Sequence, residues 1–421
     1  MSLAQEEVTP VLSESAPNSR AQGLVSVILV TYETVPSMLS DCLGAVLASN
    51  YPRIELVVVD NSQTSLVAEQ MAVWKASAPG AGNRLVFLPQ HRNTGYSAAT
   101  NRGVEASSGD LILLLNPDAV VEREAITLLV DAATRRPKAL GFAPKVSLAG
   151  HEWILDSVGI DLLLRAEGAQ RGLGEPDIGQ FDTEERIGGL CFAAALVRRS
   201  AFNSESVGSL DERFFMFYED VDWSMRATLR GEEFWSVPGA RVHHVHSASA
   251  REMPSGLKER LISRNLVWTA TKNLERRRVV RVVAHRTMVN LGRGILAGHP
   301  WTALKGVGET CIGVPGMLGS RREYQRRRRR SDREVLTKGR PIASFDSTHY
   351  VPAPTVATLL SVLSRLYVSD PDSQLGDLIL RLTLAGQTSA AYPRRVAELV
   401  RESGVEIRPG LEWLLQRFEQ D

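Results

Sequence analysis

The 421-residue sequence predicts an α/β fold, in which a mostly parallel sheet carries helices on both faces. Apolar, β-branched runs of strand length alternate with segments of helical length and periodicity over residues 24–133. This alternation is typical of parallel strands joined by crossover helices. The strand runs are continuously apolar, as expected when helices cover both faces of the sheet.

Strands and helices can be assigned in order along this region. The predicted strands are 24–31, 54–60, 84–89 and 111–115, and the predicted helices between and after them are 36–49, 66–76, 97–106 and 122–133. After residue 145 the pattern is mixed, with apolar segments near 187–197 and 234–237. Short helices are predicted again within 353–420, for example over 355–367 and 374–384.

Composition and charge give no indication of a nucleic-acid-binding, disulfide-rich or membrane-spanning protein. The net charge of +1 gives no global reason to expect nucleic acid as a partner. The three cysteines, Cys42, Cys191 and Cys311, are far apart and odd in number, so neither a disulfide framework nor a cysteine zinc site is predicted, which fits a reducing cytoplasm. No run approaches the roughly 18 apolar residues of a spanning helix. Residues 1–23 lack the features of a secretory signal and are predicted to be a disordered leader.

Polar residues follow three of the four predicted strands. The first strand ends in Thr31, Tyr32 and Glu33, the second in Asp60-Asn61-Ser62 and the fourth in Asn116-Pro117-Asp118. Ligands of such sheets bind outside the carboxyl ends of the strands, so these residues outline a site. A carboxylate such as Asp118 there is well placed to hold Mg²⁺ or Mn²⁺ against a diphosphate. Each motif alone is equally explained by a turn or a helix N-cap.

A glycine-containing segment precedes the third predicted helix. It reads Asn93-Thr94-Gly95-Tyr96 and is followed by Asn101 and Gly103. Gly95 would allow a phosphate or ribose to approach the backbone near a helix N-terminus. A tight turn entering a helix explains the same residues.

The most informative segment is 210–223, where three acids follow an aromatic run. Glu219, Asp220 and Asp222 beside apolar walls are candidates for a raised pKa and for general-base catalysis. Acids at a helix N-terminus are the alternative interpretation, because they interact favourably with the helix dipole. Arg226, one turn beyond Asp222, is placed to pair with it.

Three of the eight histidines lie in His243-His244-Val245-His246. On a strand, His244 and His246 would point to the same side. Histidine is a common metal ligand, so one of them is a candidate partner of Asp118. A polar surface strand is the alternative.

Taken in order, these motifs resemble glycosyltransferase family 2, in particular its bacterial rhamnosyltransferase-like branch with a GT-A fold. The resemblance covers roughly residues 24–275 and is carried by five ordered motifs, 27–32, 57–62, 93–103, 114–118 and 214–222. In many relatives the first residue of the metal motif is Asp, whereas this sequence has the uncharged Asn116.

The resemblance implies roles for individual residues. Asp118 and His244 would ligate the metal, and His244 is preferred over His246 because it aligns with the family's histidine before a downstream serine, here Ser249. Asp220 would be the general base of an inverting displacement, with Glu219 orienting the acceptor or the base. The nucleotide-sugar would be held by Thr31, Tyr32, Glu33, Asp60, Asn61, Asn93, Gly95, Asn101 and Asn116. The acceptor side would be formed by Gly189, Leu190, Asp222 and Trp223, although a core position is the stronger interpretation of Trp223.

A basic stretch follows the predicted catalytic region. Residues 276–330 contain 14 Lys or Arg, only two acids and interleaved apolar residues. This pattern is typical of a segment that binds an anionic membrane surface, which would suit a glycan or lipid-linked acceptor. A solvated helical face is the alternative, and nucleic acid is not predicted because no recognition motif accompanies the arginines.

Four segments are therefore predicted: a leader at 1–23, a GT-A domain at 24–275, a basic amphipathic segment at 276–330, and a small helical module at 331–421 that mediates oligomerisation or partner binding. The predicted function is a metal-dependent inverting transferase of a sugar, preferably rhamnose, from a dTDP- or UDP-sugar, in the cytoplasm or peripheral on the inner membrane face. The alternatives are a non-catalytic scaffold of the same fold and a nucleotidyltransferase. A nucleotidyltransferase would need a Gly-rich, basic phosphate loop, which residues 31–36 do not provide.

Overall fold

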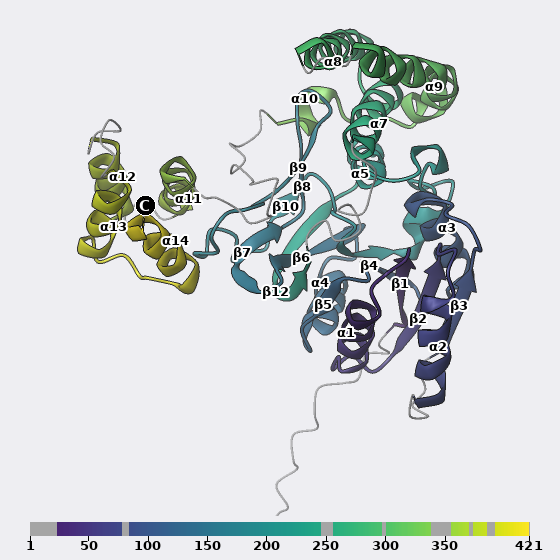
Figure 1. Cartoon of the computed structure of the whole chain (residues 1–421), viewed down its shortest axis with the longest axis horizontal. Coiled ribbons are helices and arrows are strands. Elements are labelled where there is room, and N and C mark those ends of the chain that lie inside the picture. The colour runs from purple at the N-terminus through teal and green to yellow at the C-terminus, as the bar shows by residue number, and fades with distance from the viewer. Residues whose placement is uncertain are drawn as a thin grey trace, which may run out of the picture.

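A ten-stranded mixed sheet forms the centre of the computed structural model (Figure 1). The structure describes residues 23–77, 84–245, 256–296, 300–337, 355–369, 374–384 and 392–420. The predicted leader therefore lies outside the described residues except for Gly23, and so do His246 and Ser249. The main path of strands through the sheet runs β10-β12-β6-β11-β4-β1-β2-β3.

One half of this sheet is wholly parallel. It consists of β1 (Val25–Thr31), β2 (Ile54–Asp60), β3 (Arg84–Pro89) and β4 (Leu111–Leu115). β1 lies between β2 and β4 and is parallel to both, with Thr31 opposite Asp60 and Leu29 opposite Leu115. The carboxyl ends of these strands therefore meet at one edge.

The other half of the sheet begins with an antiparallel strand, followed by strands that again run parallel to β4. β11 (Ala194–Arg198) is antiparallel to both β4 and β6 (Gly141–Leu148), so β6 runs in the same direction as β4. β12 (Phe234–His244) is parallel to β6. His244 thus lies at the same edge of the sheet as Thr31, Asp60 and Asn116. Shorter strands complete the sheet: β5 (Ala119–Val121) pairs with β12, β7 (His151–Ser157) with β6, and β10 (Arg186–Ile187) with β12.

Helices cover both faces, and the alternation of strand side chains creates two cores. Val27 and Leu29 pack toward α1 (Pro36–Leu47), α2 (Leu66–Ser77) and α4 (Ala125–Arg135). Ile28 packs on the opposite face toward α3 (Tyr96–Ala106) and α5 (Glu219–Arg230). The predicted fold class, a mostly parallel sheet flanked by helices, is confirmed.

Three long helices stand beside α5 and extend away from the sheet (Figure 1). They are α7 (Leu257–Asn273), α8 (Arg276–Leu296) and α9 (Pro300–Arg326). The buried ammonium group of Lys272 on α7 lies 2.9 Å from Asp222 on α5 and 2.6 Å from Asp211. α8 shares a core with α5, with the small hairpin of β8 (Ile160–Leu162) and β9 (Gly168–Gln170), and with α10 (Asp332–Val335). No helix within the described ranges is long and apolar enough to cross a membrane.

The remaining described helices form a module with a core of its own. They are α11 (Val356–Ser369), α12 (Leu375–Leu384), α13 (Tyr392–Glu402) and α14 (Pro409–Gln420). Ile178 from the segment after β7 enters this core, and Arg365 pairs with Glu175 at 2.6 Å. The module therefore docks at the far side of the sheet from β3 (Figure 1).

Candidate active site

The ends of β1 and β2 are joined by the buried carboxylate of Asp60. Its Oδ1 accepts hydrogen bonds from Thr31 Oγ1 at 2.9 Å and from the backbone N–H of Ser62 at 3.0 Å. Ser62 Oγ in turn accepts from the N–H of Glu33 at 2.8 Å. Asp60 is thus fixed in position by both strand ends, as required of a group that is to contact a ligand reproducibly.

Glu33 forms the outer rim of this strand end. It adopts a left-handed backbone conformation (φ 45°), and its carboxylate accepts from the N–H of Gln63 at 2.9 Å. The hydrogen bond from the Thr64 side chain, opposed in part by burial, lowers the pKa of Glu33. The neighbouring Tyr32 is exposed. Glu33 therefore holds the 62–64 turn against the end of β1.

Asn61 connects β2 to the glycine-containing loop. Its Nδ2 donates to the carbonyl of Gly95 at 3.2 Å, and its Oδ1 accepts from Thr94 Oγ1 at 2.8 Å. The N–H of Gly95 donates to Asn93 Oδ1 at 3.0 Å. Asn61, Asn93 and Gly95, predicted from separate motifs, are thus brought together in one loop.

Gly95 is required for two structural reasons. Its φ of 84° is in the left-handed region, and a Cβ at this position would lie 2.4 Å from the carbonyl oxygen of Phe215. This close approach places the start of α3 directly against the aromatic run that precedes Glu219. The side chain of Asn101 supports the same contact, since it donates to the Leu210 carbonyl and accepts from the Leu210 N–H, at 3.0 and 2.9 Å.

The Asn116-Pro117-Asp118 motif faces His244. Asp118 Oδ1 and Asn116 Nδ2 each lie 3.2 Å from His244 Nε2. On the other side of the ring, His244 Nδ1 is 2.7 Å from Asp156 Oδ2 on β7. His243, one residue earlier, points to the opposite side of the strand and contacts Ser147 and Glu122. His244 is therefore the histidine that the strand presents to Asp118.

Two carboxylates determine the electrostatics around His244. Burial lowers its pKa, but hydrogen bonds with Asp118 and Asp156 and the charges of these two carboxylates outweigh burial and raise the pKa to about 10. A histidine held between two carboxylates in this way keeps Nδ1 engaged and aims Nε2 at the space shared with Asp118. Hydrogen bonding of one ring nitrogen to a carboxylate is the usual arrangement for histidines that ligate metals. Asp156, which the sequence motifs did not indicate, provides this bond.

The residues present fit a divalent cation that is held partly by its substrate. Two ligands of one octahedral ion, with bonds of about 2.1 Å at right angles, are about 3 Å apart, and Asp118 Oδ1 and His244 Nε2 are 3.2 Å apart. Within the described ranges no group of three or more His, Cys, Asp or Glu is placed to hold a metal. Phosphate oxygens and water would therefore complete the coordination, as is usual for Mg²⁺.

The acidic pair Glu219-Asp220 begins α5 directly after a strained turn. Phe215, Phe217 and Tyr218 all have positive φ, of 66°, 66° and 70°. Bulky side chains disfavour this conformation, and it persists only where the surroundings hold it. The surroundings here include Asn265 on α7, whose fully buried Nδ2 donates to the carbonyls of Phe214, Met216 and Phe217 at 3.1, 2.9 and 2.7 Å.

Burial sets the protonation of this acidic pair. It raises the pKa of Asp220 to about 6, although the N–H groups of Val221 and Phe192 hydrogen-bond the carboxylate and oppose the change. Burial and the neighbouring Asp220 charge raise the pKa of Glu219 further. Glu219 Oε2 is buried without a hydrogen-bond partner among the described residues. Burial therefore raises the pKa of both carboxyl groups, as is common for acids and bases in active sites, and one oxygen of Glu219 is unused within the described ranges.

A three-residue segment joins the metal motif to the acidic pair. The carbonyl of Ala193 accepts from the N–H of Asn116 at 2.9 Å, while the N–H of Phe192 bonds Asp220. The Phe192 carbonyl accepts from Tyr96 Oη at 3.2 Å, next to the start of α3. The segment Cys191–Ala193 therefore runs between the two halves of the site and sets their separation.

Three residues predicted on the acceptor side are buried, and for Trp223 this agrees with the core position that was the stronger interpretation of its sequence. Trp223 is 0% exposed, packs against Phe192 and Phe234, and donates from Nε1 to the Gly208 carbonyl. Leu190 lies in the same core, and Asp222 pairs with Arg226 and Lys272. For Asp222 the helical period explains the burial, because residues two apart on α5 point to nearly opposite sides, so Asp222 faces away from Asp220.

Gly189 serves the packing of α5 rather than an open surface. A Cβ on Gly189 would lie 2.6 Å from the Cβ of Ser224, and Ser224 Oγ accepts from the N–H of Leu190 at 3.0 Å. The segment that leads to Phe192 is thus fixed to the same helix that carries Asp220.

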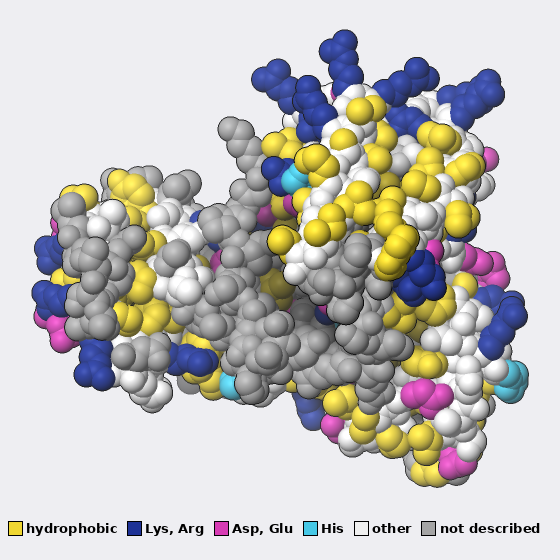
Figure 2. Space-filling view, turned by 45° about the horizontal axis from the view of Figure 1, so that its top comes forward, with side chains coloured by type: hydrophobic (Ala, Val, Ile, Leu, Met, Phe, Trp, Pro, Cys, Tyr) yellow, Lys and Arg dark blue, Asp and Glu magenta, His cyan; other side chains and the backbone are white. Residues whose placement is uncertain are grey.

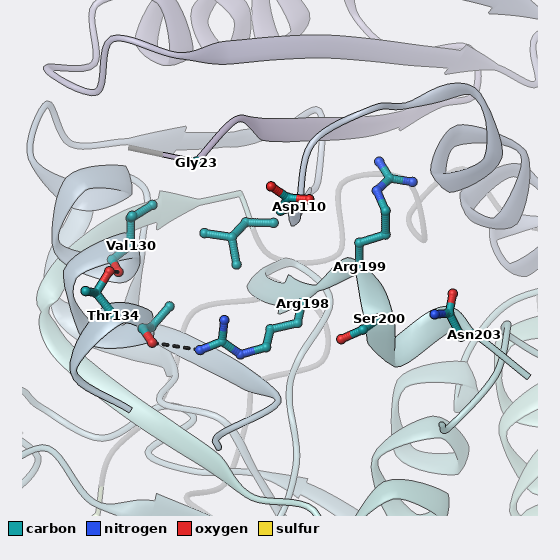
Figure 3. Close-up of a pocket in the computed structure, with 10 residues that line it drawn as sticks. Gly23, Asp110, Val130, Thr134, Arg198, Arg199, Ser200 and Asn203 are labelled. Atoms are coloured by element: carbon teal, nitrogen blue, oxygen red, sulfur yellow. Dashed lines mark hydrogen bonds between the residues drawn. The ribbon is translucent and has the colours of Figure 1, made fainter. Parts of the chain in front are cut away.

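A separate cavity of about 500 Å³ lies at the opposite ends of the strands, near Gly23 and Asp110 (Figure 3). Arg198 and Arg199 line it, but both donate to backbone carbonyls at helix ends, Arg198 to Ala133 at 2.7 Å and Arg199 to Val104 at 2.9 Å. These arginines cap α4 and α3, and the cavity is remote from the carboxyl edge. The candidate active site is therefore the edge described above.

The sequence of this chain is similar to those of known proteins. Residues 26–204 match the model of "Glycosyl transferase family 2". An N-acetylglucosaminyl-diphospho-decaprenol L-rhamnosyltransferase of Mycobacterium tuberculosis is 29% identical over 257 residues, which cover 56% of this chain and 80% of that protein. An N-acetylglucosaminyltransferase of Azorhizobium caulinodans is 26% identical over 227 residues, 51% of this chain and 53% of that protein.

Among solved structures, GalNAc-T7 with UDP, GalNAc and Mn²⁺ is similar with a TM-score of 0.48 and 15% identity. The similarity covers 60% of this chain, which spans about half (48%) of that structure. A likeness of this size says nothing about the site.

Proposed function

We propose that this chain belongs to glycosyltransferase family 2 and transfers a sugar from a nucleotide diphosphate donor to a hydroxyl group with inversion at the anomeric carbon. One observation carries the proposal. The Asp118–His244 pair and the Glu219–Asp220 pair belong to different elements, yet the segment Cys191–Ala193 bonds both Asn116, two residues before Asp118, and Asp220, at the carboxyl edge of one sheet.

The donor is proposed to lie along the ends of β1, β2 and β4. Thr31, Asp60 and Asn61 would contact the nucleoside, with Tyr32 and Glu33 at the rim. The loop at Asn93 and Gly95 and the amide of Asn116 would complete the nucleotide-sugar site, and Asn101 would support that loop from α3. Strand ends of this kind are the usual ligand site of such sheets.

Mg²⁺ or Mn²⁺ is proposed as cofactor, held by Asp118 and His244. When bound, the ion would stabilise negative charge on the departing nucleoside diphosphate. Asp156 would keep the His244 ring oriented, and Asn116, which has no charge, would contribute a hydrogen bond instead of a second carboxylate.

Asp220 is proposed as the general base. At neutral pH its pKa of about 6 leaves it mostly ionised, and burial together with the charge of Asp220 raises the pKa of Glu219. The acceptor oxygen would attack the anomeric carbon, its proton would pass to Asp220, and the bond from that carbon to the phosphate oxygen would break with both electrons on the phosphate. Glu219 Oε2, which has no partner among the described residues, would hydrogen-bond the acceptor.

The donor sugar and acceptor are proposed from the relatives. A dTDP- or UDP-sugar is proposed as the donor, with rhamnose preferred, and a glycan or lipid-linked saccharide as acceptor, because the relative from M. tuberculosis is named as an L-rhamnosyltransferase acting on a diphospho-decaprenol. A cytoplasmic place of action, peripheral on the inner face of the membrane, is part of the proposal.

The test is nucleotide release from a panel of dTDP- and UDP-sugars, with a lipid-linked N-acetylglucosamine diphosphate as acceptor, in Mn²⁺ and in EDTA. The expected result is metal-dependent release from one donor that increases when the acceptor is present. Equal release in EDTA would refute the metal, and the absence of release from every donor would refute the transferase activity.

A further inference from the structure

The helices α8 and α9 form a hairpin whose outer surface is unusually apolar. Sixteen large hydrophobic side chains are exposed among the described residues, and eight of them lie on these two helices. Figure 2 shows hydrophobic side chains gathered over this part of the surface. The eight are Val280, Met288, Ile295, Leu296, Trp301, Leu304, Ile312 and Leu318.

The inner faces of both helices are already used for packing. Val282 of α8 is buried in the core that includes Val221 of α5. Met317 of α9 is buried against Trp268 of α7, and at Gly313 a Cβ would lie 2.1 Å from the Trp268 ring. The two helices therefore have a fixed orientation, and their apolar outer rows are not needed to hold them in place.

Basic side chains gather at one end of the same hairpin. Arg276, Arg277 and Arg281 are exposed at the start of α8, and Arg322 and Arg326 at the end of α9. These ends are adjacent, because Arg321 of α9 donates to the carbonyl of Leu274 just before α8 at 2.6 Å. Figure 2 shows Lys and Arg side chains projecting around the hydrophobic rows.

The acids of the hairpin do not neutralise this charge. Glu309 pairs with Arg260 and Glu323 with Arg327, each at 3.4 Å. The outer surface thus combines exposed Trp, Ile and Leu side chains with unneutralised arginines. This combination matches an anionic lipid surface, where apolar side chains enter the interface and cations meet the headgroups.

We infer that the outer surface of the α8–α9 hairpin docks on an anionic lipid bilayer without spanning it. A second copy of the chain fits this surface less well, because it would cover the apolar rows without giving the arginines an anionic partner: Glu309 and Glu323 are already paired. The inference concerns binding alone and does not depend on the proposed transferase activity. For that activity the inference concerns orientation. Val282 and Val221 share one core, and Val221 follows Asp220, so the hairpin that carries this surface packs against the helix that carries the proposed base.

Cys311 allows the contact to be measured directly. It is exposed on α9 beside Ile312, whereas Cys42 and Cys191 are buried, so a thiol-reactive NBD dye would label this position in the full-length chain. The experiment compares vesicles of phosphatidylcholine alone with vesicles in which about one third of the lipid is phosphatidylglycerol. We expect NBD emission to rise and shift to shorter wavelength only with the anionic vesicles, and to return toward the free value in high salt.

A matched pair of variants identifies the surface. In co-sedimentation with the anionic vesicles, Trp301→Glu with Ile312→Glu should lower the partition coefficient at least about tenfold. The same changes at Val73 and Leu380, exposed on α2 and α12, should leave it within about twofold. Equal binding by both double variants, or an NBD signal unchanged by vesicles, would overturn the inference. So would a dimer in sedimentation velocity, without lipid, that only the hairpin variant abolishes.

Discussion

Replacing Asp220 with Asn should inactivate the protein and stabilise its fold at the same time. In the folded chain the pKa of Asp220 is about 6, compared with an ordinary value of 3.8. Protonation of Asp220 therefore stabilises the fold fully below about pH 3.8, and this stabilisation is lost as the pH rises through about 6. At pH 8 the ionised carboxylate costs at most about 3 kcal/mol, at about 1.4 kcal/mol per pK unit.

Asn cannot ionise, so Asp220→Asn should raise the free energy of unfolding by up to about 3 kcal/mol at pH 8 and by much less at pH 4. The assay is urea denaturation at the two pH values, alongside nucleotide release. Loss of a general base should lower kcat by about 10²–10⁴-fold. In the wild type, kcat/KM should rise with pH through about 6, because only the ionised form accepts the proton.

Asp222→Asn, two residues along the same helix, is the matched control. Asp222 is buried between Arg226 and Lys272, so loss of its charge leaves two cations poorly paired. Breaking a buried ion pair of this kind costs about 3–5 kcal/mol. Asp222→Asn should therefore lower the free energy of unfolding, whereas Asp220→Asn should raise it. If Asp220→Asn were destabilising at pH 8, or retained activity, the assigned environment and role of Asp220 would be wrong.

Three further substitutions test how the site is held. Gly95→Ala should destabilise the fold by about 1–3 kcal/mol in urea titrations, since it strains a positive φ and meets the Phe215 carbonyl; a neutral change would contradict that contact. Asn265→Ala should lower kcat by about tenfold with little change in the donor KM, because it releases the turn before Glu219 while leaving the donor edge intact; an effect on KM alone would argue against this role. Asp156→Asn should weaken Mn²⁺ binding by about 10–100-fold in calorimetric titrations, and unchanged affinity would remove Asp156 from the metal site.

The strands were predictable because their signal is local. Uninterrupted apolar runs gave 54–60, 84–89 and 111–115, and β2, β3 and β4 have these bounds. Helix ends shifted by up to three residues, for example from 122–133 to Ala125–Arg135, because no N-cap side chain marks the start of α4.

Residues whose role depends on distant partners were not predictable. Asp156 follows no motif, and its contact with His244 depends on the pairing of β7 with β6 and of β6 with β12. Asn265 lies inside a helix and donates hydrogen bonds to backbone carbonyls. A contact with backbone atoms does not depend on the partner's side chain, so the sequence pattern does not indicate it. Trp223 looks the same in sequence whether it faces a cleft or the core, and only the packing of α5 decides between them.

Donor binding to Asp118→Asn and Asp220→Asn, measured by calorimetry with Mn²⁺ and compared with single-turnover transfer, separates the proposed metal site from the proposed base. We expect Asp118→Asn to lose metal-dependent binding of the nucleotide sugar, and Asp220→Asn to bind it as the wild type does but to transfer nothing. Normal donor binding by Asp118→Asn, or normal transfer by Asp220→Asn, would contradict the division of this sheet edge into a donor half and a catalytic half.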